Sequence, residues 1–276
     1  MTERVKKILR SIGSILRSDP QKLFRFERHL VNQPFFFQGT NGRAVILAHG
    51  WSSTPYEVRR LGKYLNENGY TVSGPMLRGH GTVPKDLEGV KWQDWLNDLD
   101  AEYERLHATH DKIYLAGTSI GSSLSLLLAQ RKPEIGALVL MATPFHIRFE
   151  RQVIWILRAT RFFKKYRRKF YPPTFGSART ITRLISYQTY PIDSVLEIYP
   201  LIEEVRHILP QIKAPCLIIQ SSSDHIVSRG SLEKIYAQIG SVTKQKRYIH
   251  RAYHTFISDI KNEHVFEDIL NFLNEN

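Results

Sequence analysis

The sequence has a single cysteine, Cys216, among its 276 residues, and this scarcity excludes an intrachain disulfide. Nothing in the chain therefore requires an oxidising compartment. Cys216 stands inside an apolar run from Pro215 to Ile219, which is typical of a buried strand. We expect an inert core thiol there rather than a nucleophile.

Long apolar stretches are lacking as well. No segment approaches the ~20 consecutive apolar residues that a membrane-spanning helix needs. The first twenty residues are basic, and the charges of Lys6, Lys7, Arg10 and Arg17 interrupt any apolar stretch of a signal peptide. The sequence therefore predicts a cytoplasmic protein, with peripheral attachment at the inner face of the membrane left open.

Acidic residues are too few to balance the basic ones, and the formal net charge is +13. The excess lies in two segments. Residues 1–30 hold eight Lys and Arg against three acids, and residues 147–170 hold nine against one, which gives +5 and +8 and leaves the rest neutral. Such local basicity predicts a surface that meets an anionic partner.

From about residue 34 onward, short apolar runs alternate with helical patterns. Because strands covered by helices on both faces are near-continuous apolar runs, this alternation predicts an α/β fold with a mostly parallel, doubly wound sheet. The chain is 42% hydrophobic, enough for a substantial core. We expect strands at 34–38, 43–48, 71–77, 112–117, 136–142, 215–220 and 246–250, and helices at 55–68, 91–108, 120–131, 229–239 and 261–273.

One region breaks this rhythm. Between Pro144 and about Pro210 there is no clear strand, and aromatic and basic residues accompany several short helical patterns. We expect a helical cap over the carboxyl edge of the sheet, where open α/β sheets bind ligands. The predicted organisation is a basic amphipathic segment at 1–30, a core at 31–144 and 211–276, and a cap insertion at 145–210.

The sequence Gly117-Thr118-Ser119-Ile120-Gly121 joins an apolar run to a helical pattern. A G-x-S-x-G motif at a strand-to-helix turn is the setting of a nucleophile elbow, in which a strained turn exposes the serine hydroxyl. Flanking side chains would collide with the neighbouring strand and helix, so glycine is needed on both sides. The motif alone often arises by chance, and its placement is what makes Ser119 the candidate nucleophile.

A serine hydroxyl needs a base to remove its proton, and on this fold the triad follows the order Ser, Asp or Glu, His. Two aspartates precede the late histidines: Asp193 in the predicted cap and Asp224 just past a strand. A carboxylate at the end of a strand points toward the active edge, which favours Asp224. Of the four histidines that follow, His254 stands in the loop between the last strand and the last helix and is the expected base.

Negative charge that develops on a substrate oxygen needs two backbone N–H donors. One should be the amide of Ile120, directly after the nucleophile. The other should come from the loop that begins at His49, where Gly50 allows close approach and Trp51 supplies the amide. The Trp51 ring also fits a core aromatic, and both interpretations hold together because the amide and the ring serve different ends.

Taken together, these residues resemble the bacterial carboxylesterase and monoacylglycerol lipase family of α/β-hydrolases. The resemblance covers residues 43–144 and 212–274, and the joint pattern is much more specific than any one piece. Besides Gly117 to Gly121, its motifs are His49-Gly50-Trp51, Arg78-Gly79-His80-Gly81-Thr82, Trp92-Gln93-Asp94-Trp95-Leu96-Asn97-Asp98, Ser223-Asp224-His225-Ile226-Val227 and Tyr253-His254.

The resemblance implies hydrolysis of a small-molecule acyl ester through an acyl-enzyme intermediate, with no cofactor and no metal. It assigns the nucleophile, acid and base to Ser119, Asp224 and His254, and the oxyanion amides to Trp51 and Ile120. The family usually has Phe where Trp51 stands and Met where Ile120 stands, so the acyl pocket should differ in shape. The cap is also longer and more basic than the family's.

His80 is a candidate substrate-binding residue in the loop that follows the third expected strand. A hydrogen bond to the neighbouring loop is the structural alternative, and we favour it.

The predicted function is cleavage of a lipid-derived ester such as a monoacylglycerol or a lysolipid. The same triad serves thioesterases, peptidases and acyltransferases, and a non-catalytic binding module would keep the same fold. The complete triad argues against the binding module, because a decayed site would often have lost one member.

The two basic segments also contain apolar residues. In residues 1–20 they recur at helical spacing opposite the charges, and in residues 147–170 aromatic rings stand among the charges, as in segments that lie at a membrane interface. We predict peripheral contact with an anionic membrane surface through both segments. The alternative is a helix packed on the domain with a solvated charged face, and no nucleic acid is expected because no nucleic-acid-binding module is visible.

Overall fold

The computed structural model describes residues 32–169, 185–250, 252–259 and 262–276. The whole predicted amphipathic segment at 1–30, including the membrane-contacting stretch at 1–20, therefore lies outside the described residues. Within the described part of the chain, no helix is long and apolar enough to cross a membrane.

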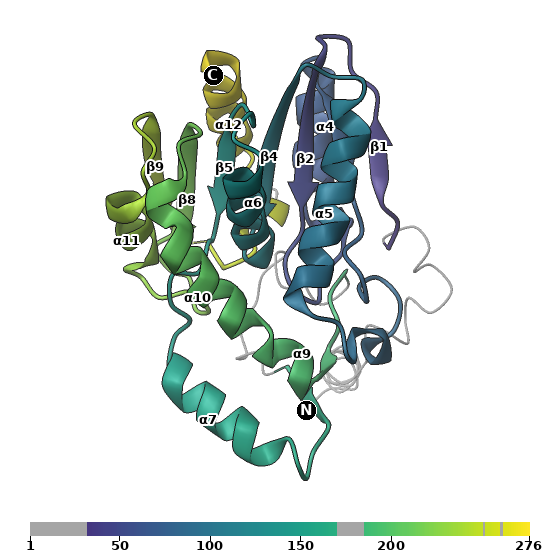
Figure 1. The fold of residues 1–276 in the computed structure, drawn as a ribbon, viewed down its shortest axis with the longest axis vertical. Helices are drawn as coiled ribbons and strands as arrows, with labels where there is room; N and C mark the ends of the chain where they lie inside the picture. Colours follow the sequence, from purple (N-terminus) through teal and green to yellow (C-terminus); the bar gives the residue numbers. More distant parts are fainter. Residues whose placement is uncertain (1–31, 170–184, 251, 260–261) are drawn as a thin grey trace, which may run out of the picture.

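A seven-stranded sheet forms the centre of the described structure, in the order β1-β3-β2-β4-β5-β8-β9 (Figure 1). Only β1 is antiparallel to its neighbour, and every other pair is parallel. The strands span Phe35–Phe37 (β1), Arg43–Ala48 (β2), Thr71–Gly74 (β3), Lys112–Thr118 (β4), Leu138–Met141 (β5), Cys216–Ser221 (β8) and Lys244–Ile249 (β9). The predicted α/β class and the predicted strand positions are confirmed.

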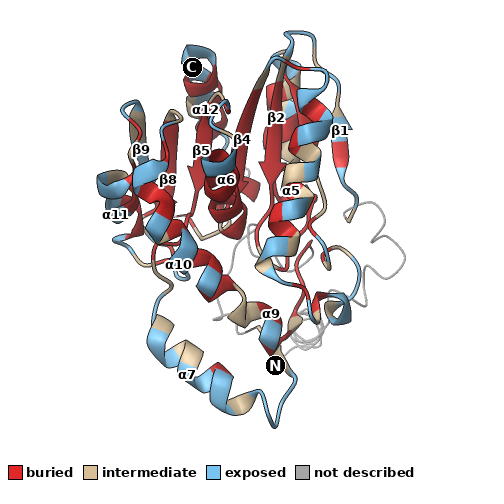
Figure 2. Ribbon diagram, in the orientation of Figure 1, coloured by how far each residue is buried: buried red, intermediate tan, exposed pale blue. Residues whose placement is uncertain are grey.

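Helices cover both faces of this sheet because successive strand residues point to opposite sides. Ile46 and Leu115 pack with one set of helices, whereas their neighbours Val45 and Tyr114 pack with the other. The first set is α5 (Trp92–His107), α6 (Ile120–Arg131), α10 (Ile198–Ile208) and α11 (Ser231–Gln238), and the second is α4 (Arg59–Glu67) and α12 (His264–Glu275). The central strands are therefore buried along almost their whole length (Figure 2).

Short 3-10 turns connect several of these elements. They span Pro55–Glu57 (η1), Pro84–Leu87 (η2), Leu209–Gln211 (η3) and Phe256–Ser258 (η4). Cys216 in β8 is fully buried, as expected, and burial raises the pKa of its thiol to about 12. It is therefore a protonated core residue at neutral pH.

The chain between β5 and β8 forms the insertion, which lies beyond the carboxyl edge of the sheet (Figure 1). It contains α7 (Glu150–Thr160), α9 (Ile192–Leu196) and finally α10, whose buried side chains join the core against α6. Our expectation that this region lacks strands is wrong. Tyr166–Arg168 (β6) pairs antiparallel with Thr189–Pro191 (β7), and strands of three residues are too short for hydrophobic alternation to reveal them.

Candidate active site

Ser119 stands at the sharp turn between β4 and α6. Its backbone has φ 55° and ψ −118°, a conformation that residues with a side chain rarely adopt. The amide of Ser119 donates to the carbonyl of Met141 in the adjacent strand at 2.8 Å, which fixes the turn against β5. The side chain is partly exposed, although both flanking residues are buried.

The glycines around Ser119 are required by contact with backbone atoms. A Cβ added to Gly117 would lie 2.3 Å from the carbonyl carbon of Gly121. A Cβ on Gly121 would lie 2.2 Å from the carbonyl oxygen of Ala48 in β2. Real Cβ atoms do not approach backbone atoms this closely. The steric requirement for glycine on both sides of the serine is therefore confirmed by contacts with Gly121 and Ala48.

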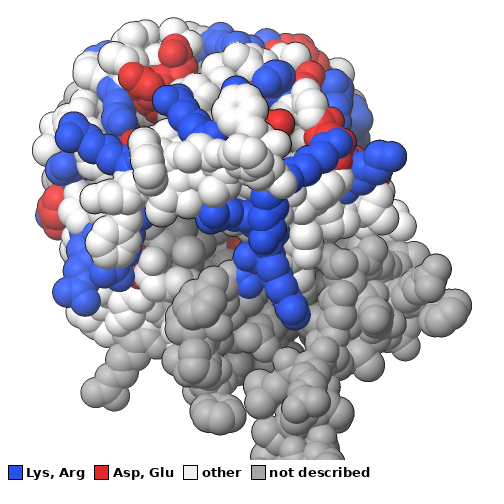
Figure 3. All heavy atoms as spheres, turned by 90° about the horizontal axis from the view of Figure 1, so that it is seen from below, with Lys and Arg blue, Asp and Glu red and all other residues white. Residues whose placement is uncertain are grey.

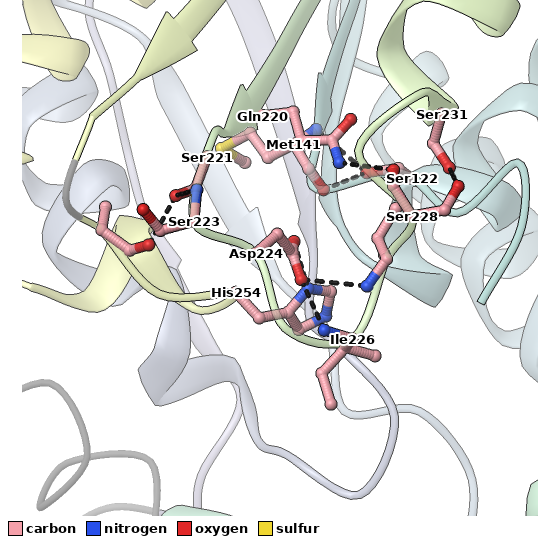
Figure 4. A network of polar contacts seen from close by, with 12 residues as sticks. Ser122, Met141, Gln220, Ser221, Ser223, Asp224, Ile226, Ser228, Ser231 and His254 are labelled. Atoms are coloured by element: carbon pink, nitrogen blue, oxygen red, sulfur yellow. Dashed lines mark hydrogen bonds and ion pairs between the residues drawn. The ribbon is translucent and has the colours of Figure 1, made fainter. Parts of the chain in front are cut away.

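Asp224 and His254 form a direct pair. His254 Nδ1 donates to Asp224 Oδ2 at 2.8 Å, while Asp224 Oδ1 accepts the amides of Ile226 and Val227 at 2.8 and 2.9 Å (Figure 4). The Asp224 side chain is fully buried and that of His254 is 12% exposed. The alternative carboxylate, Asp193, is exposed on α9 in the cap.

Strand order brings these groups to one edge of the sheet. Ser119 follows β4, Asp224 follows β8, and both strands pair with β5 between them. His254 follows β9, the next strand beyond β8. All three side chains therefore project from the carboxyl edge, although Ser119 and His254 do not hydrogen-bond to each other in the part of the chain that is described.

Opposing effects set the charge states of the pair. Burial acts to raise the pKa of Asp224, but the charge and hydrogen bond of His254 and the two backbone amides together hold it below the usual value. Burial acts to lower the pKa of His254, but Asp224, aided by the charge of Glu57, raises it above 6.5. The pair thus favours an ionised acid beside a histidine that accepts a proton readily.

The loop after β2 approaches the serine closely. A Cβ on Gly50 would lie 3.6 Å from Ser119 Cβ. The amide of Trp51, next in the chain, and that of Ile120, in the first turn of α6, have no hydrogen-bond partner among the described residues. Amides in the first turn of a helix, such as that of Ile120, have no partner within the helix. Together with the Trp51 amide from the loop, this gives two backbone donors beside the serine that suit a developing oxyanion.

The Trp51 ring belongs to the contact between this loop and the cap. Its indole N–H donates to Ser194 Oγ on α9 at 3.0 Å, and its ring meets Tyr190 of β7 edge-on at 5.0 Å between centroids. The ring packs against the cap, so the amide and the ring serve different ends, as the sequence suggests.

His80 is 2% exposed, and its Nδ1 lies 3.2 and 3.1 Å from the carbonyl oxygens of Leu77 and Arg78. Its ring meets those of His49 and Trp95 edge-on. Burial holds the pKa of His80 well below the usual value, so the ring is neutral. This environment favours the structural role, and a contact with substrate stays a prediction.

Two charged residues near the site escaped the sequence analysis. Glu57 is 2% exposed, and its Oε2 accepts the amide of Gly50 at 2.9 Å. Lys169, just past β6 in the cap, donates to Ser52 Oγ and lies 5.4 Å from the centroid of the Trp51 ring. Glu57 occurs in a stretch whose pattern is that of an ordinary amphipathic helix, and Lys169 is one of nine basic residues in 147–170, so neither sequence pattern sets them apart.

Within the described ranges, His, Cys, Asp and Glu side chains do not gather in groups of three that would hold a metal ion. The arrangement of the candidate residues is that of nucleophilic catalysis by serine.

Comparison with known proteins identifies a family. The family model described as serine aminopeptidase, S33, matches residues 39–261. A carboxylesterase of Bacillus subtilis (strain 168) is 30% identical over 244 residues, which is 87% of this chain and 96% of that protein. A thermostable monoacylglycerol lipase of Bacillus sp. (strain H-257) is 29% identical over 243 residues, covering 87% of this chain and 93% of that protein.

Solved structures agree on the fold. A structure from work on the metagenome-derived lipolytic enzymes LipS and LipT matches with a TM-score of 0.79 and 26% identity, over 89% of this chain and 98% of that one. The monoacylglycerol lipase of Paleococcus ferrophilus matches with a TM-score of 0.74 over 88% of this chain and 98% of that one. At 16% identity, the second match speaks for the fold alone.

The glycine at the elbow yields a stability prediction. Gly121→Ala should lower the free energy of unfolding by about 1–3 kcal/mol or more, because the new methyl group meets backbone that cannot move aside. Gly230→Ala is the matched control, since a Cβ there meets nothing within 4 Å, and it should change stability by less than about 0.5 kcal/mol. Urea denaturation measures both, and equal stabilities would contradict the steric argument.

The Asp224–His254 pair yields a pH prediction. A base must be neutral to take the serine proton, so labelling of Ser119 by a fluorophosphonate should speed up as pH rises through the His254 pKa, above 6.5. Asp224→Asn should slow labelling roughly 10⁴-fold and move the remaining titration to lower pH. Asp193→Asn, which alters an exposed cap carboxylate, should leave rate and titration unchanged, and the reverse ranking would exclude Asp224 as the acid.

Proposed function

This chain belongs to the α/β-hydrolase family whose model is described as serine aminopeptidase, S33, and from that premise we propose that Ser119, His254 and Asp224 hydrolyse carboxylic esters through an acyl-enzyme intermediate. The two Bacillus relatives, which are named a carboxylesterase and a monoacylglycerol lipase, support an ester as the substrate. The observation on which the proposal rests most is the buried Asp224–His254 hydrogen bond at the edge where the strained Ser119 turn lies.

The proposed reaction begins with attack on the ester carbonyl. Ser119 Oγ bonds to the carbonyl carbon while His254 Nε2 takes the hydroxyl proton, which is possible because Asp224 keeps the other proton on Nδ1. The carbonyl oxygen becomes negative and accepts hydrogen bonds from the amides of Trp51 and Ile120. His254 then returns its proton to the leaving alcohol as the ester bond breaks.

A water molecule completes the cycle. His254 takes a proton from the water, which attacks the acyl carbon of the Ser119 ester. The second tetrahedral intermediate collapses, the carboxylic acid leaves, and the proton returns to Ser119 Oγ. The same steps would serve a thioester, and we propose an oxygen ester because both close relatives are named for esterase or lipase activity.

Ser119→Ala tests the nucleophile. It should reduce hydrolysis of a panel of acyl esters, including monoacylglycerols and p-nitrophenyl esters, by roughly 10⁴- to 10⁶-fold. Ser123→Ala is the matched control on the same helix, because its buried hydroxyl has no partner among the described residues. Retention of more than a tenth of the wild-type activity by pure Ser119→Ala would exclude Ser119 as the nucleophile. Thioesters and amides in the same panel separate the esterase from the alternative activities.

We further propose that the cap contacts an anionic membrane surface through residues 147–170. Val153, Ile154 and Leu157 of α7 pack inward against α9 and α10. Large apolar side chains nevertheless remain on the outer side of α7 and at its ends, where Phe149 is 69%, Trp155 72%, Phe162 77% and Phe163 94% exposed. A helix that only packs on the domain has no need for this second apolar surface.

The charges around these rings support an anionic bilayer as the partner. Exposed basic residues accompany them just before α7, along α7, and from the turn that follows to the end of β6, namely Arg148, Arg151, Arg158, Arg161, Lys164, Lys165 and Arg168. Figure 3 views this end of the molecule and shows Lys and Arg side chains around a band of uncharged residues. Aromatic rings among basic residues suit the lipid headgroup region, and each basic residue near an anionic surface contributes about 1 kcal/mol.

This contact would also deliver the substrate. The cap borders the carboxyl edge, so a bilayer docked on α7 would lie near Ser119, and a lipid-derived ester such as a monoacylglycerol or lysolipid would reach the site without crossing water. Residues 1–20, which lie outside the described residues, would add a second weak anchor, and two anchors hold better than one.

The membrane proposal is tested by co-sedimentation with phosphatidylglycerol–phosphatidylcholine vesicles and with phosphatidylcholine vesicles. We expect preference for the anionic vesicles, weakened by salt because exposed charges are screened over ~8 Å. Replacing Arg151, Arg158, Arg161 and Lys164 with Gln should lower affinity about tenfold or more. The double substitution Trp155→Ser with Phe163→Ser should also weaken binding to the anionic vesicles relative to the wild type. Deletion of residues 1–20 should do the same.

Two controls match these variants. Replacing the exposed Lys63, Lys85, Arg131 and Lys213 with Gln removes the same charge outside the cap, and Val242→Ser removes a 96% exposed apolar residue from another loop. Both controls should bind like the wild type. Equal, weak binding to the two vesicle types, or an equal loss in the charge control, would overturn the proposal.

A further inference from the structure

Besides Asp224, a second carboxylate lies close to the site. Glu57 stands in the turn η1 and is only 2% exposed. Its Oε2 accepts the backbone amide of Gly50 at 2.9 Å, and the Ser53 side chain also hydrogen-bonds to the carboxylate. A buried carboxylate with so few donors is costly, so the position invites a functional reason.

Glu57 touches the loop at the point nearest the nucleophile. A Cβ on Gly50 would lie 3.2 Å from Glu57 Oε2 and 3.6 Å from Ser119 Cβ. Gly50 therefore separates the carboxylate from the nucleophile by a single residue without a side chain. A Cβ at position 50 would be in tight contact with the carboxylate, so the Glu57 side chain or the loop would have to shift by a few tenths of an ångström to admit it.

The hydrogen bond to Gly50 also orients the loop. The Glu57 carboxylate holds the Gly50 N–H, and the next amide, that of Trp51, has no partner among the described residues and is available to an oxyanion. From the other side, the cap fixes the neighbouring Ser52, whose φ is 59°, through the amide of Tyr187 and the ammonium of Lys169. Glu57 and the cap thus hold the loop from two different elements, with Ser52 in a strained backbone conformation.

The charge of Glu57 acts on the base. Charged or titratable groups that influence His254 come from three elements: Asp224 after β8, Glu57 in η1, and Lys169 in the cap. Asp224 and Glu57 raise the pKa of His254, whereas burial and Lys169 lower it. Burial raises the pKa of Glu57 above its usual value, and the hydrogen bonds of Gly50 and Ser53 and the charges of His254 and Lys169 offset this rise only in part. The charged form of Glu57 is therefore favoured most when His254 carries its proton.

We propose that Glu57 is a positioning residue for the reaction, whose carboxylate fixes the Gly50–Trp51 loop for the oxyanion and whose negative charge stabilises the His254 imidazolium that forms during attack. The proposal rests on the proposed serine mechanism. It assigns two separable tasks to one side chain, the acceptance of a hydrogen bond and the supply of a charge.

Two substitutions separate these tasks. Glu57→Gln keeps an oxygen that accepts the Gly50 amide but removes the charge, whereas Glu57→Ala removes both. Glu57→Gln should move the acidic limb of the kcat/KM profile to lower pH, because His254 then loses its proton more easily. Glu57→Ala should move the limb in the same direction and also lower kcat about 10²- to 10³-fold, as loss of an oxyanion donor does.

The measurements are pH profiles of ester hydrolysis and of fluorophosphonate labelling at Ser119, with circular dichroism to verify folding. Glu67→Gln is the control, since it makes the same chemical change at a carboxylate that is 60% exposed at the end of α4, and it should leave both profiles unchanged. KM should change little in Glu57→Gln, because Glu57 contacts the loop rather than the substrate.

Each outcome decides a separate point. An acidic limb in Glu57→Gln identical to that of the wild type would overturn the charge task, and a folded Glu57→Ala with wild-type kcat would overturn the loop task. If Glu57→Ala does not fold, Glu57→Gln still tests the charge. If the wild type hydrolyses no ester and yet is labelled at Ser119, the ester function fails while the labelling profiles still decide the role of Glu57.

Discussion

The close approach of α6 to β2 at the serine turn is the constraint on which the rest of the site depends. Ser119 holds φ 55° because the turn is fixed by the Ser119–Met141 hydrogen bond and by contact of Gly121 with the carbonyl of Ala48. A residue held in this region costs on the order of 1–3 kcal/mol, which a well-packed parallel sheet can sustain. As a result, the serine side chain points away from its own backbone and lies beside the first amides of α6.

Two buried carboxylates, Asp224 and Glu57, lie around this turn. Asp224 accepts hydrogen bonds from His254 and two backbone amides, whereas Glu57 accepts them only from Gly50 and Ser53 among the described residues. The two carboxylates act on a single imidazole, from the loop after β8 and from η1. In a low-dielectric site, these fields act more strongly than they would in water, so small changes in either carboxylate should be felt at the histidine.

The cap contacts the loop after β2 on one side and forms part of the molecular surface on the other. Its inner side contacts Trp51 and Ser52 through Ser194, Tyr190 and Lys169, while its outer side exposes the aromatic and basic residues of α7. An element that touches the reacting loop on one side and faces outward on the other is well placed to couple binding at a surface to the geometry of the site. The same segment thus contributes both to positioning and to the proposed choice of lipid substrates.

The sequence by itself determined the sheet and the glycine-flanked serine turn, because apolar runs and paired glycines are local patterns with local causes. It also placed a histidine after the last strand, and the triad built on that histidine stays a prediction. It did not reveal β6 and β7, which are three residues long and pair across an insertion. Nor did it reveal Glu57 or Lys169, since an acid in a helical pattern and one lysine among many look like solvated charges. Only the tertiary structure decided their roles, because burial and the approach of distant segments, rather than residue type, bring these charges beside Gly50, Ser52 and His254.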